Sequence, residues 1–453
     1  MMADNRKEKK NSIDMLHGTL LDKIVLFALP LAASSVLQQL FNSVDIAVVG
    51  QFAGKEAMAA VGSNSSVINL VITLFVGLSV GANVVIANYI GQRNRLGIKR
   101  AVDTIAAVAL ISSAILLVLG IALARPILEY IDTPADIIDL STLYLRIYFA
   151  GIPFIMVFNF GAAILRGKGD TQRPLYCLLV SGVINALLNV VLVVVFQLGV
   201  AGVGIATVVA NCVSAVMVVR ILQTERNPYR LVVRRMRVHT AELVKMVRIG
   251  LPAGVQGMVF AVANVTIQSS INSFGSAAVA GSAAALNFEH FCYYIIASFA
   301  AAAVTFMGQN FAAGQKQRCR RIFFHSMWLS LVCCGVFNAL FTWQEAFFVS
   351  LFNNDPAVCK FAYIRMEWVL LVQFIASSYE VAAGALRGLG YSSLPALLTV
   401  VGTCALRLWW VDVVVPSHHS FKWLMAVYPF SWVVTGTMVL AAYFWVCRKK
   451  GIY

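Results

Sequence analysis

Twelve apolar segments, each long enough to cross a lipid bilayer, constrain the fold of this chain more than any other feature. A transmembrane α-helix needs about 20 consecutive, predominantly apolar residues. Apolar runs between polar breaks predict spans at approximately 24–50, 62–89, 101–124, 141–165, 174–197, 199–222, 246–274, 278–308, 322–352, 361–386, 394–416 and 423–447. The sequence therefore predicts an all-α polytopic membrane protein with twelve transmembrane helices.

The composition supports a membrane protein. Of the 453 residues, 60% are hydrophobic and 12% are charged. Soluble globular domains carry about 25% charged residues. A chain of this length with so few charges cannot cover a soluble surface.

The formal net charge of +15 could indicate nucleic-acid binding, but most Lys and Arg residues lie on alternate connections between spans. The opposite side has Lys55, Arg125, Lys360 and Lys422, and three more lie within spans, Arg146, Arg365 and Arg407. The positive-inside rule then places both termini in the cytoplasm. We expect a multi-pass protein of the plasma (inner) membrane with no nucleic-acid partner.

The nine cysteines are scattered and have no CxxC or Cys/His ligand spacing. Most lie in apolar runs, where cysteine acts as a small hydrophobic residue. The sequence therefore predicts neither disulfides nor a cysteine metal site. Residues 1–22 are polar and lack the apolar run of a signal peptide, so we expect the first span to direct insertion.

The two halves of the chain repeat each other. "ILRGKGDTQRP" from Ile164 is answered by "ALRGLGYSSLP" from Ala385, and "KIVLFALP" from Lys23 by "KMVRIGLP" from Lys245. Six spans per copy give both copies the same orientation, as in parallel-repeat transporters. We expect an N-terminal tail (1–22), an N-lobe (23–221), a linker (222–244), a C-lobe (245–447) and a short tail (448–453), with tails and linker cytoplasmic.

The repeated segment predicts a helix hairpin on the cytoplasmic side of each lobe. Its two glycines can take positive φ and reverse the chain, and its proline suits the first turn of the next helix. Arg166 and Arg387 end the preceding helices, where a cation is favoured by the helix dipole. A structural role and a role in gate contacts between the lobes both remain open.

Asp45 is the clearest candidate for function, because an ionisable residue within a span is costly to bury. Gln38, Asn42 and Asp45 follow one another at helical spacing and share one face. Pro30, earlier in the same span, removes a backbone hydrogen bond and predicts a kink.

Counting along the helices brings other polar groups to a similar depth. Asp45 is about 8 Å from the outer end of its span, and Thr207 is about 12 Å below the outer end of span 6. Asn185 and Asn189 lie about 17–22 Å up span 5 on one face. A carboxylate with amide and hydroxyl oxygens suits Na⁺, and a lone buried carboxylate suits H⁺. Both remain open.

The second half offers Gln256, Glu289 and Glu380, which join Gln38 and Asn42 as candidates for lining a substrate cavity. For the acids of this half, structural and functional roles are both open. Arg146 and Arg365 lie near outer helix ends, and structural roles are favoured. Glu367, Arg407 and Asp412 are too close to span ends to assign.

The chain as a whole resembles the multidrug and toxic compound extrusion (MATE) family. The resemblance rests on "LPLAASSVLQQLFNSVDIAVVG", "NALLNVVLVVVFQLGVAGVGIATVV" and the paired "LRGKGDTQRP" and "LRGLGYSSLP". It implies two six-helix lobes around a central cavity. It also implies a secondary antiporter that exports organic, often cationic and drug-like, compounds in exchange for H⁺ or Na⁺ by alternating access.

The resemblance also implies a cation site at Asp45, Asn185, Asn189 and Thr207, with Na⁺ as the possible metal. Asn189 stands where many relatives carry Asp, which leaves one carboxylate at the site. Span 7 has no acid, and Glu380 is displaced by about one turn from the Asp usual in span 10. A second-lobe cation site of the family's type is therefore not expected.

Three alternatives remain. A flippase of lipid-linked oligosaccharide would need a strongly cationic cavity, and a major facilitator carrier usually has an Asp in its basic loop between spans 2 and 3. A membrane scaffold would not need a buried Asp45. We expect a transporter of small molecules rather than an enzyme, monomeric in the lipid bilayer, with no cofactor beyond the coupling ion.

Overall fold

The computed structural model describes residues 12–131, 133–418 and 420–453, so the predicted N-terminal tail is described only from Ser12 and its basic residues 6–10 lie outside this range. In the described residues all regular structure is helical, and twelve helical stretches are long and apolar enough to cross a membrane. The twelve predicted spans are confirmed, and most extend a few residues beyond the predicted ends.

The first six spans are α2 (Leu21–Phe52), α3 (Lys55–Gly91), α4 (Arg95–Tyr130), α5 (Ile138–Lys168), α6 (Gln172–Asn189) with the π-helix η1 (Val190–Val195), and α7 (Gly199–Thr224). The next three are α8 (Thr240–Asn272), α9 (Ser276–Ala312) and α10 (Lys316–Trp343). The last three are α12 (Pro356–Arg365) to α13 (Ser377–Gly388) through η3 (Met366–Leu370) and η4 (Gln373–Ala376), α14 (Ser393–Thr399) to α15 (Leu406–His418) through η5 (Val400–Ala405), and α16 (Phe421–Lys449). Two short elements, η2 (Val233–Arg235) and α11 (Glu345–Ser350), lie in connections.

One predicted span was too long. The apolar run 322–352 was expected to form a single helix, but α10 ends at Trp343 and Gln344 separates it from α11. The polar pair Gln344–Glu345 marks this break in the sequence. The hydrophobic run continued past it, so periodicity alone could not show that the helix ends there.

The chain forms two compact units whose boundaries fall inside helices. Unit 1 contains Ala33–Leu251 with the described residues before Asp14, and unit 2 contains Asp14–Ala32 with Pro252–Tyr453. The boundary in α2 follows Pro30 by two residues, and the boundary in α8 directly precedes Pro252. The expected division had placed all of span 1 in the N-lobe and all of span 7 in the C-lobe.

The first parts of α2 and α8 are exchanged between the units. In unit 1, Tyr89 of α3 donates a hydrogen bond to Glu242 (3.1 Å) and accepts one from Lys245 (2.8 Å), both on α8. In unit 2, Phe27 of α2 packs edge-to-face on Phe306 of α9 with ring centroids 5.6 Å apart. Each unit therefore includes the first part of one helix, α2 or α8, from the other half of the sequence.

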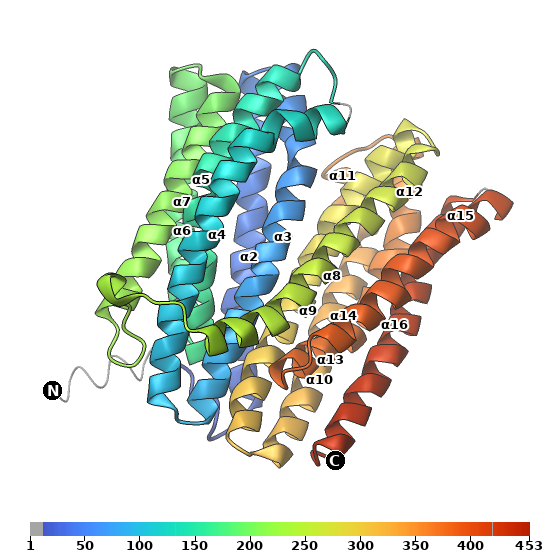
Figure 1. Ribbon diagram of the computed structural model, residues 1–453. Coiled ribbons are helices and arrows are strands. Elements are labelled where there is room, and N and C mark those ends of the chain that lie inside the picture. Colours follow the sequence, from blue (N-terminus) through green and yellow to red (C-terminus); the bar gives the residue numbers. More distant parts are fainter. Residues whose placement is uncertain (1–11, 132, 419) are drawn as a thin grey trace. The chain divides into compact units, whose positions relative to one another are not determined.

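Within unit 1, α5 packs against α3, α4 and α7 (Figure 1). Its buried side chains include Phe149, Met156 and Phe160. Within unit 2, α9 packs against α10, α12 and α13. The rings of Phe323 and Tyr443 stack there with centroids 3.9 Å apart.

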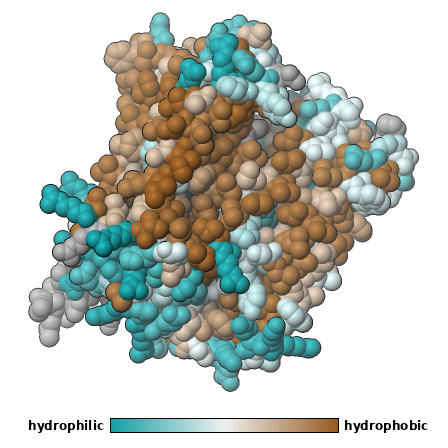
Figure 2. Space-filling model, in the orientation of Figure 1, coloured by the Kyte–Doolittle hydropathy of each residue, from teal (hydrophilic) through white to brown (hydrophobic). Residues whose placement is uncertain are grey.

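Large apolar side chains remain exposed along the helices. Val118, Leu187 and Val195 of unit 1 expose 66%, 63% and 68% of their surface. Figure 2 shows brown, apolar residues over the helices of unit 1 and teal, hydrophilic residues near their ends. Exposed apolar patches of this extent are a liability in water and are what a lipid-facing surface requires.

Candidate functional site

The four residues predicted to bind a cation meet in unit 1. Asp45 lies on α2, Asn185 and Asn189 lie one turn apart on α6, and Thr207 lies on α7. Asp45 exposes 8% of its surface, and Asn185 and Asn189 expose 5% and 0%. Spans 1, 5 and 6 thus enclose one polar cluster in an otherwise apolar region.

Hydrogen bonds join these four side chains directly. Asn189 Nδ2 donates to Asp45 Oδ1 and, at 3.2 Å, to Asn185 Oδ1. Thr207 Oγ1 lies 3.4 Å from both Asp45 Oδ2 and Asn185 Nδ2, and donates to the carbonyl oxygen of Val203 at 2.9 Å. Both carboxylate oxygens of Asp45 are therefore held by neutral groups.

The charge of Asp45 has no protein counter-charge in the part of the chain that the structure describes: its hydrogen-bond partners are Asn189 and Thr207. Asn189 Oδ1 is buried and has no hydrogen-bond donor among the described residues. A carboxylate without a basic partner, beside an amide oxygen without a hydrogen-bond donor, can hold either a proton or a small cation.

A π-helix begins directly after this cluster. α6 ends at Asn189 and η1 continues the span from Val190. π-helical turns are rare and are frequent at functional sites, because the wider turn changes which backbone groups are paired. Its sequence, "VVLVVV", shows no polar or glycine signal that would have predicted it.

The residues predicted to line a substrate cavity have different surroundings. In unit 1, Gln38 and Asn42 are exposed on α2. In unit 2, Gln256 Oε1 accepts a hydrogen bond from Arg387 Nη2 at 2.7 Å, and Glu380 accepts one from the hydroxyl of Tyr293 at 3.4 Å. Gln256 and Glu380 therefore belong to one polar cluster around Arg387, whose charge also acts on Glu380.

Glu289 takes part in an ion pair. Arg365 donates to its two carboxylate oxygens at 2.5 and 3.0 Å, and both residues are buried. Gln373 Nε2 donates to the main-chain oxygen of Glu289 at 2.9 Å. This bidentate pair favours a structural role for Glu289 over a role in lining a cavity.

Comparison with known proteins agrees with this architecture. A family model described as MatE matches residues 30–191 and 252–409, which include Asp45, Asn185 and Asn189. The chain belongs to the MatE family.

The relatives of this MatE-family protein match it over most of its length. It is 26% identical over 440 residues to the probable multidrug resistance protein YoeA of Bacillus subtilis (strain 168), covering 94% of both chains. It is 25% identical over 397 residues to the probable multidrug resistance protein NorM of Thermotoga maritima, covering 85% of this chain and 84% of that one.

A solved structure shows the same two-lobe, twelve-helix fold. The outward-facing conformation of a multidrug resistance MATE family transporter of the MOP superfamily has a TM-score of 0.89. It is 19% identical and covers 96% of this chain and 98% of that one. The protein is therefore a multi-pass membrane transporter with the MATE fold.

The repeated hairpins of this MatE-family protein have the same geometry in both units. Gly169 and Gly390 have φ of 99° and 90° and donate to the main-chain oxygens of Arg166 and Arg387, each at 2.9 Å. Pro174 and Pro395 lie in the first turns of the following helices, as predicted.

The first glycine of each hairpin has a different role from the one expected. It stays in the helix, and a Cβ at Gly167 would lie 2.7 Å from Ile86, while a Cβ at Gly388 would lie 2.6 Å from the main-chain oxygen of Val304. The first glycine thus permits close packing on span 2 or span 8, and only the second takes positive φ. Sequence reasoning had allowed positive φ at both.

Among the residues that the structure describes, the unit-1 hairpin also carries an ion network that its unit-2 counterpart lacks. Glu225, just after α7, accepts a hydrogen bond from Lys168 at 2.7 Å and pairs with Arg173 at 2.5 Å. Burial alone would raise the pKa of Glu225, but the hydrogen bond and charge of Lys168 and the charge of Arg173 outweigh it and lower the pKa. Burial raises the pKa of the neighbouring Asp170, which also pairs with Arg173.

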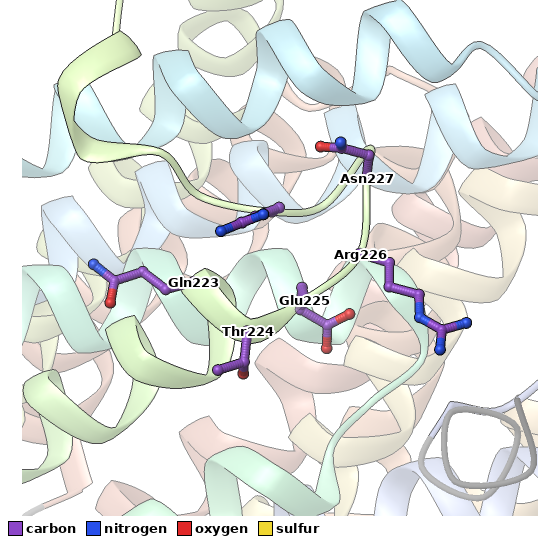
Figure 3. A pocket seen from close by; sticks show the side chains of 6 residues that line it. Gln223, Thr224, Glu225, Arg226 and Asn227 are labelled. Carbon is purple, nitrogen blue, oxygen red and sulfur yellow. The ribbon is translucent and has the colours of Figure 1, made fainter. Parts of the chain in front are cut away.

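A hollow of about 520 Å³ lies on the same connection (Figure 3) and is lined by Gln223, Thr224, Glu225, Arg226, Asn227 and Arg230. A second hollow, of about 390 Å³, lies on the C-terminal part of α2 and is lined by Ser43, Ile46, Ala47, Gly50 and Gln51. Neither hollow is lined by the predicted cavity residues. Because the carboxylate of Glu225 is already paired, we assign the first hollow to the connection and not to a binding site.

Arg407 is a residue that sequence reasoning missed. It was taken to lie too close to a span end, but it is fifteenth in the 26-residue span Ser393–His418 and exposes 3% of its surface. The signal that could have found it was its position in the middle of the predicted span 394–416, where an unpaired arginine is costly.

Proposed function

We propose that this protein is a secondary antiporter that exports organic, drug-like compounds in exchange for H⁺ or Na⁺ by alternating access between its two lobes. The observation that carries the proposal is the isolated charge of Asp45. A buried carboxylate without a basic partner needs a proton or a cation to reduce its desolvation cost. Such a group is a natural coupling site.

The surroundings of Asp45 suit a small cation as well as a proton. Asp45, Asn185, Asn189 and Thr207 offer hard oxygen atoms from three helices, and Asn189 Oδ1 has no hydrogen-bond donor among the described residues. Binding a cation there would tie α2 to α6 and α7, and releasing it would free α2. Because an ion can shift a conformational equilibrium only through differential affinity, the site must differ between the two states.

Pro30 gives α2 a place to bend between its two packing environments. The helix runs without interruption from Leu21 to Phe52, but its first part belongs to unit 2 and its remainder to unit 1. Proline inside a helix removes one backbone hydrogen bond and weakens the helix there. In the proposal, ion binding at Asp45 changes how α2 packs beyond Pro30 and favours release of substrate outward.

The alternative, a lipid-linked oligosaccharide flippase, would need a strongly cationic cavity for a polyanionic substrate. Two arginines, Arg365 and Arg407, are buried in the spans of unit 2, and Arg387 is half-buried. Arg365 is paired with Glu289, and Arg387 is bound to the neutral side chain of Gln256. Among the buried arginines of the described residues in this unit, only Arg407 has no carboxylate partner. This distribution favours an exporter of small molecules.

The experiment is dye export from proteoliposomes with Na⁺ and pH gradients imposed separately. Asp45→Asn should abolish gradient-driven export, and Asp412→Asn, which changes an exposed acid in the middle of α15, should retain it. The gradient that drives export by the unchanged protein identifies the coupling ion. Full export by the Asp45→Asn variant would overturn the proposal.

A further inference from the structure

We infer that unit 2 holds a binding site for the anionic group of an aromatic organic substrate, centred on Arg407. The inference names a substrate class for the proposed exporter and so rests on that proposal. It is argued from the surroundings of one buried guanidinium and from its place in the repeat.

Arg407 of α15 is held by neutral groups from two other helices. Its Nε donates to Ser431 Oγ of α16 at 3.2 Å, and its Nη1 lies 3.4 Å from Asn264 Oδ1 of α8. Among the residues that the structure describes, no hydrogen-bond acceptor faces Nη2 and no carboxylate pairs with the guanidinium. A cation buried at this depth in a membrane protein, without a counter-charge, is a functional-site hypothesis by default.

The buried acids of unit 2 already interact with residues other than Arg407. Glu289 pairs with Arg365, and Glu380 is bound by Tyr293 and influenced by Arg387. Glu367 and Asp412 are exposed. An anion that compensates Arg407 must therefore come from outside the described chain.

Aromatic rings surround the guanidinium. Its Cζ lies 4.5 Å from the ring centroid of Tyr428 and 5.8 Å from that of Phe260. Tyr428 also faces Arg365, at 5.5 Å, so two guanidiniums share one ring. Planar rings around a fork of donors favour a flat aromatic ligand that carries a carboxylate or phosphate.

The cluster around Arg407 reaches the protein surface at Asn264. This side chain is exposed, and its contact with Arg407 is long at 3.4 Å. A carboxylate would make a shorter, charge-assisted and bidentate contact with the same guanidinium. Exchange of Asn264 for a ligand oxygen is therefore favourable.

The position of Arg407 in the repeat supports a ligand site. Spans 7, 11 and 12 correspond to spans 1, 5 and 6, which enclose Asp45. Asn264 follows Pro252 by the same number of positions as Asn42 follows Pro30, and Arg407 aligns within one position of Asn185. The π-helix η5 lies just before Arg407, as η1 lies just after Asn189. The same frame thus holds a carboxylate in unit 1 and a guanidinium in unit 2.

Binding can be measured without a gradient, by titration calorimetry of the purified protein in detergent micelles. The probes are 2-naphthoate, its neutral analogue 2-naphthamide, and inorganic phosphate. We expect 2-naphthoate to bind at least about tenfold more tightly than 2-naphthamide, because one charge-assisted pair distinguishes them. Inorganic phosphate should bind more weakly than 2-naphthoate. Equal binding of 2-naphthoate and 2-naphthamide, or of 2-naphthoate and phosphate, would overturn the assignment.

Two variants test the residue itself. Arg407→Gln should remove the preference for 2-naphthoate, and Asn264→Asp should do the same by supplying an internal carboxylate while leaving Arg407 and the core in place. Arg146→Gln, which changes an exposed span arginine of unit 1, should keep the preference. Retained preference in folded Asn264→Asp protein would contradict the inference even if Arg407→Gln failed to fold.

The binding assay also separates this inference from the proposed function. Asp45→Asn should keep the preference for 2-naphthoate, because the two sites lie in different units. If export proves independent of both ion gradients while the preference persists and depends on Arg407, the proposed antiport fails and the anion site stands. If export follows a gradient but the preference is absent, the anion site fails alone.

Discussion

Three corresponding helices enclose a polar cluster in each half of the molecule, and the two clusters have opposite charge. In unit 1, Asp45 is bound by the amide of Asn189 and the hydroxyl of Thr207, and Asn189 is bound in turn to Asn185. In unit 2, Arg407 is bound by an amide and a hydroxyl. The comparison shows that a duplicated scaffold keeps its hairpins while its buried charges diverge. The two proposals together give such a transporter separate places for a cation and for an anionic group.

The largest effect on stability should come from the paired acid of unit 2. Glu289→Gln leaves Arg365 buried without a counter-charge, and breaking such a pair costs about 3–5 kcal/mol. Thermal unfolding in detergent micelles, followed by tryptophan fluorescence, measures the loss. The control Glu367→Gln changes an exposed acid in the span that carries Arg365 and should be near neutral. A small loss at Glu289 would show that Arg365 does not depend on this pair.

The next largest effects on stability should come from the glycines of the two hairpins, and the two effects should differ in size. Gly388→Ala places a Cβ 2.6 Å from the main-chain oxygen of Val304, whereas Gly167→Ala places one 2.7 Å from Cγ2 of Ile86, a side-chain atom. Overpacking costs about 1–3 kcal/mol, and the loss should be larger at Gly388 because a main chain yields less easily than a side chain.

The matched control for the hairpin glycines is Gly335→Ala in α10, where a Cβ would meet no atom within 4 Å. Removing a helical glycine there should stabilise the protein by about 0.5–1 kcal/mol. The same thermal unfolding assay serves all three variants. Equal losses at Gly167 and Gly388 would mean that the two hairpins pack with equal tolerance.

The isolated acid of unit 1 should respond in the opposite direction from Glu289. Asp45→Asn removes a buried charge that has no basic partner, so the ion-free protein should gain about 1 kcal/mol in stability. If the coupling ion is Na⁺, adding Na⁺ should raise the unfolding temperature of the unchanged protein but not that of the variant. If it is H⁺, lowering the pH should do so instead. If Asp45→Asn instead loses as much stability as Glu289→Gln, Asp45 is a structural residue. The buried acids of the two units then have the same role.

Much of this architecture could be predicted from the sequence, because a helix that crosses a membrane must be long and predominantly apolar. The apolar runs give the twelve spans, and counting residues along helices placed Asp45, Asn185, Asn189 and Thr207 at similar depths before any contact was known. In the structure these four are in contact. Helical rise alone sufficed there, since adjacent spans in a bundle must align at the same depth.

What could not be predicted depends on contacts between distant residues. Asn264 and Arg407 are far apart in the chain, so no local pattern shows that one faces the other. The exchange of the first parts of α2 and α8 between units also escapes periodicity, because the same apolar face can pack on either partner. The π-helices likewise follow from packing and have no signature in runs such as "VVLVVV".

The smallest effect concerns the ion network that, within the described part of the chain, is found only at the unit-1 hairpin. Glu225→Gln keeps the volume and one acceptor oxygen but loses the charge that faces Lys168 and Arg173, so we expect a loss of about 1 kcal/mol at pH 7. Because the pKa of Glu225 is lowered in the folded protein, its contribution is complete above the unfolded value of about 4.3 and disappears as the pH falls below it. Unfolding temperatures of the unchanged protein and the variant should therefore converge in acid. Asp170 should act with the opposite sign, since burial raises its pKa and its ionisation weakens the folded state as the pH rises from about 3.9. If the difference in unfolding temperature between the Glu225 variant and the unchanged protein stays constant with pH, the network does not depend on the charge of Glu225. The ion network would then not distinguish the stability of the unit-1 hairpin from that of the unit-2 hairpin.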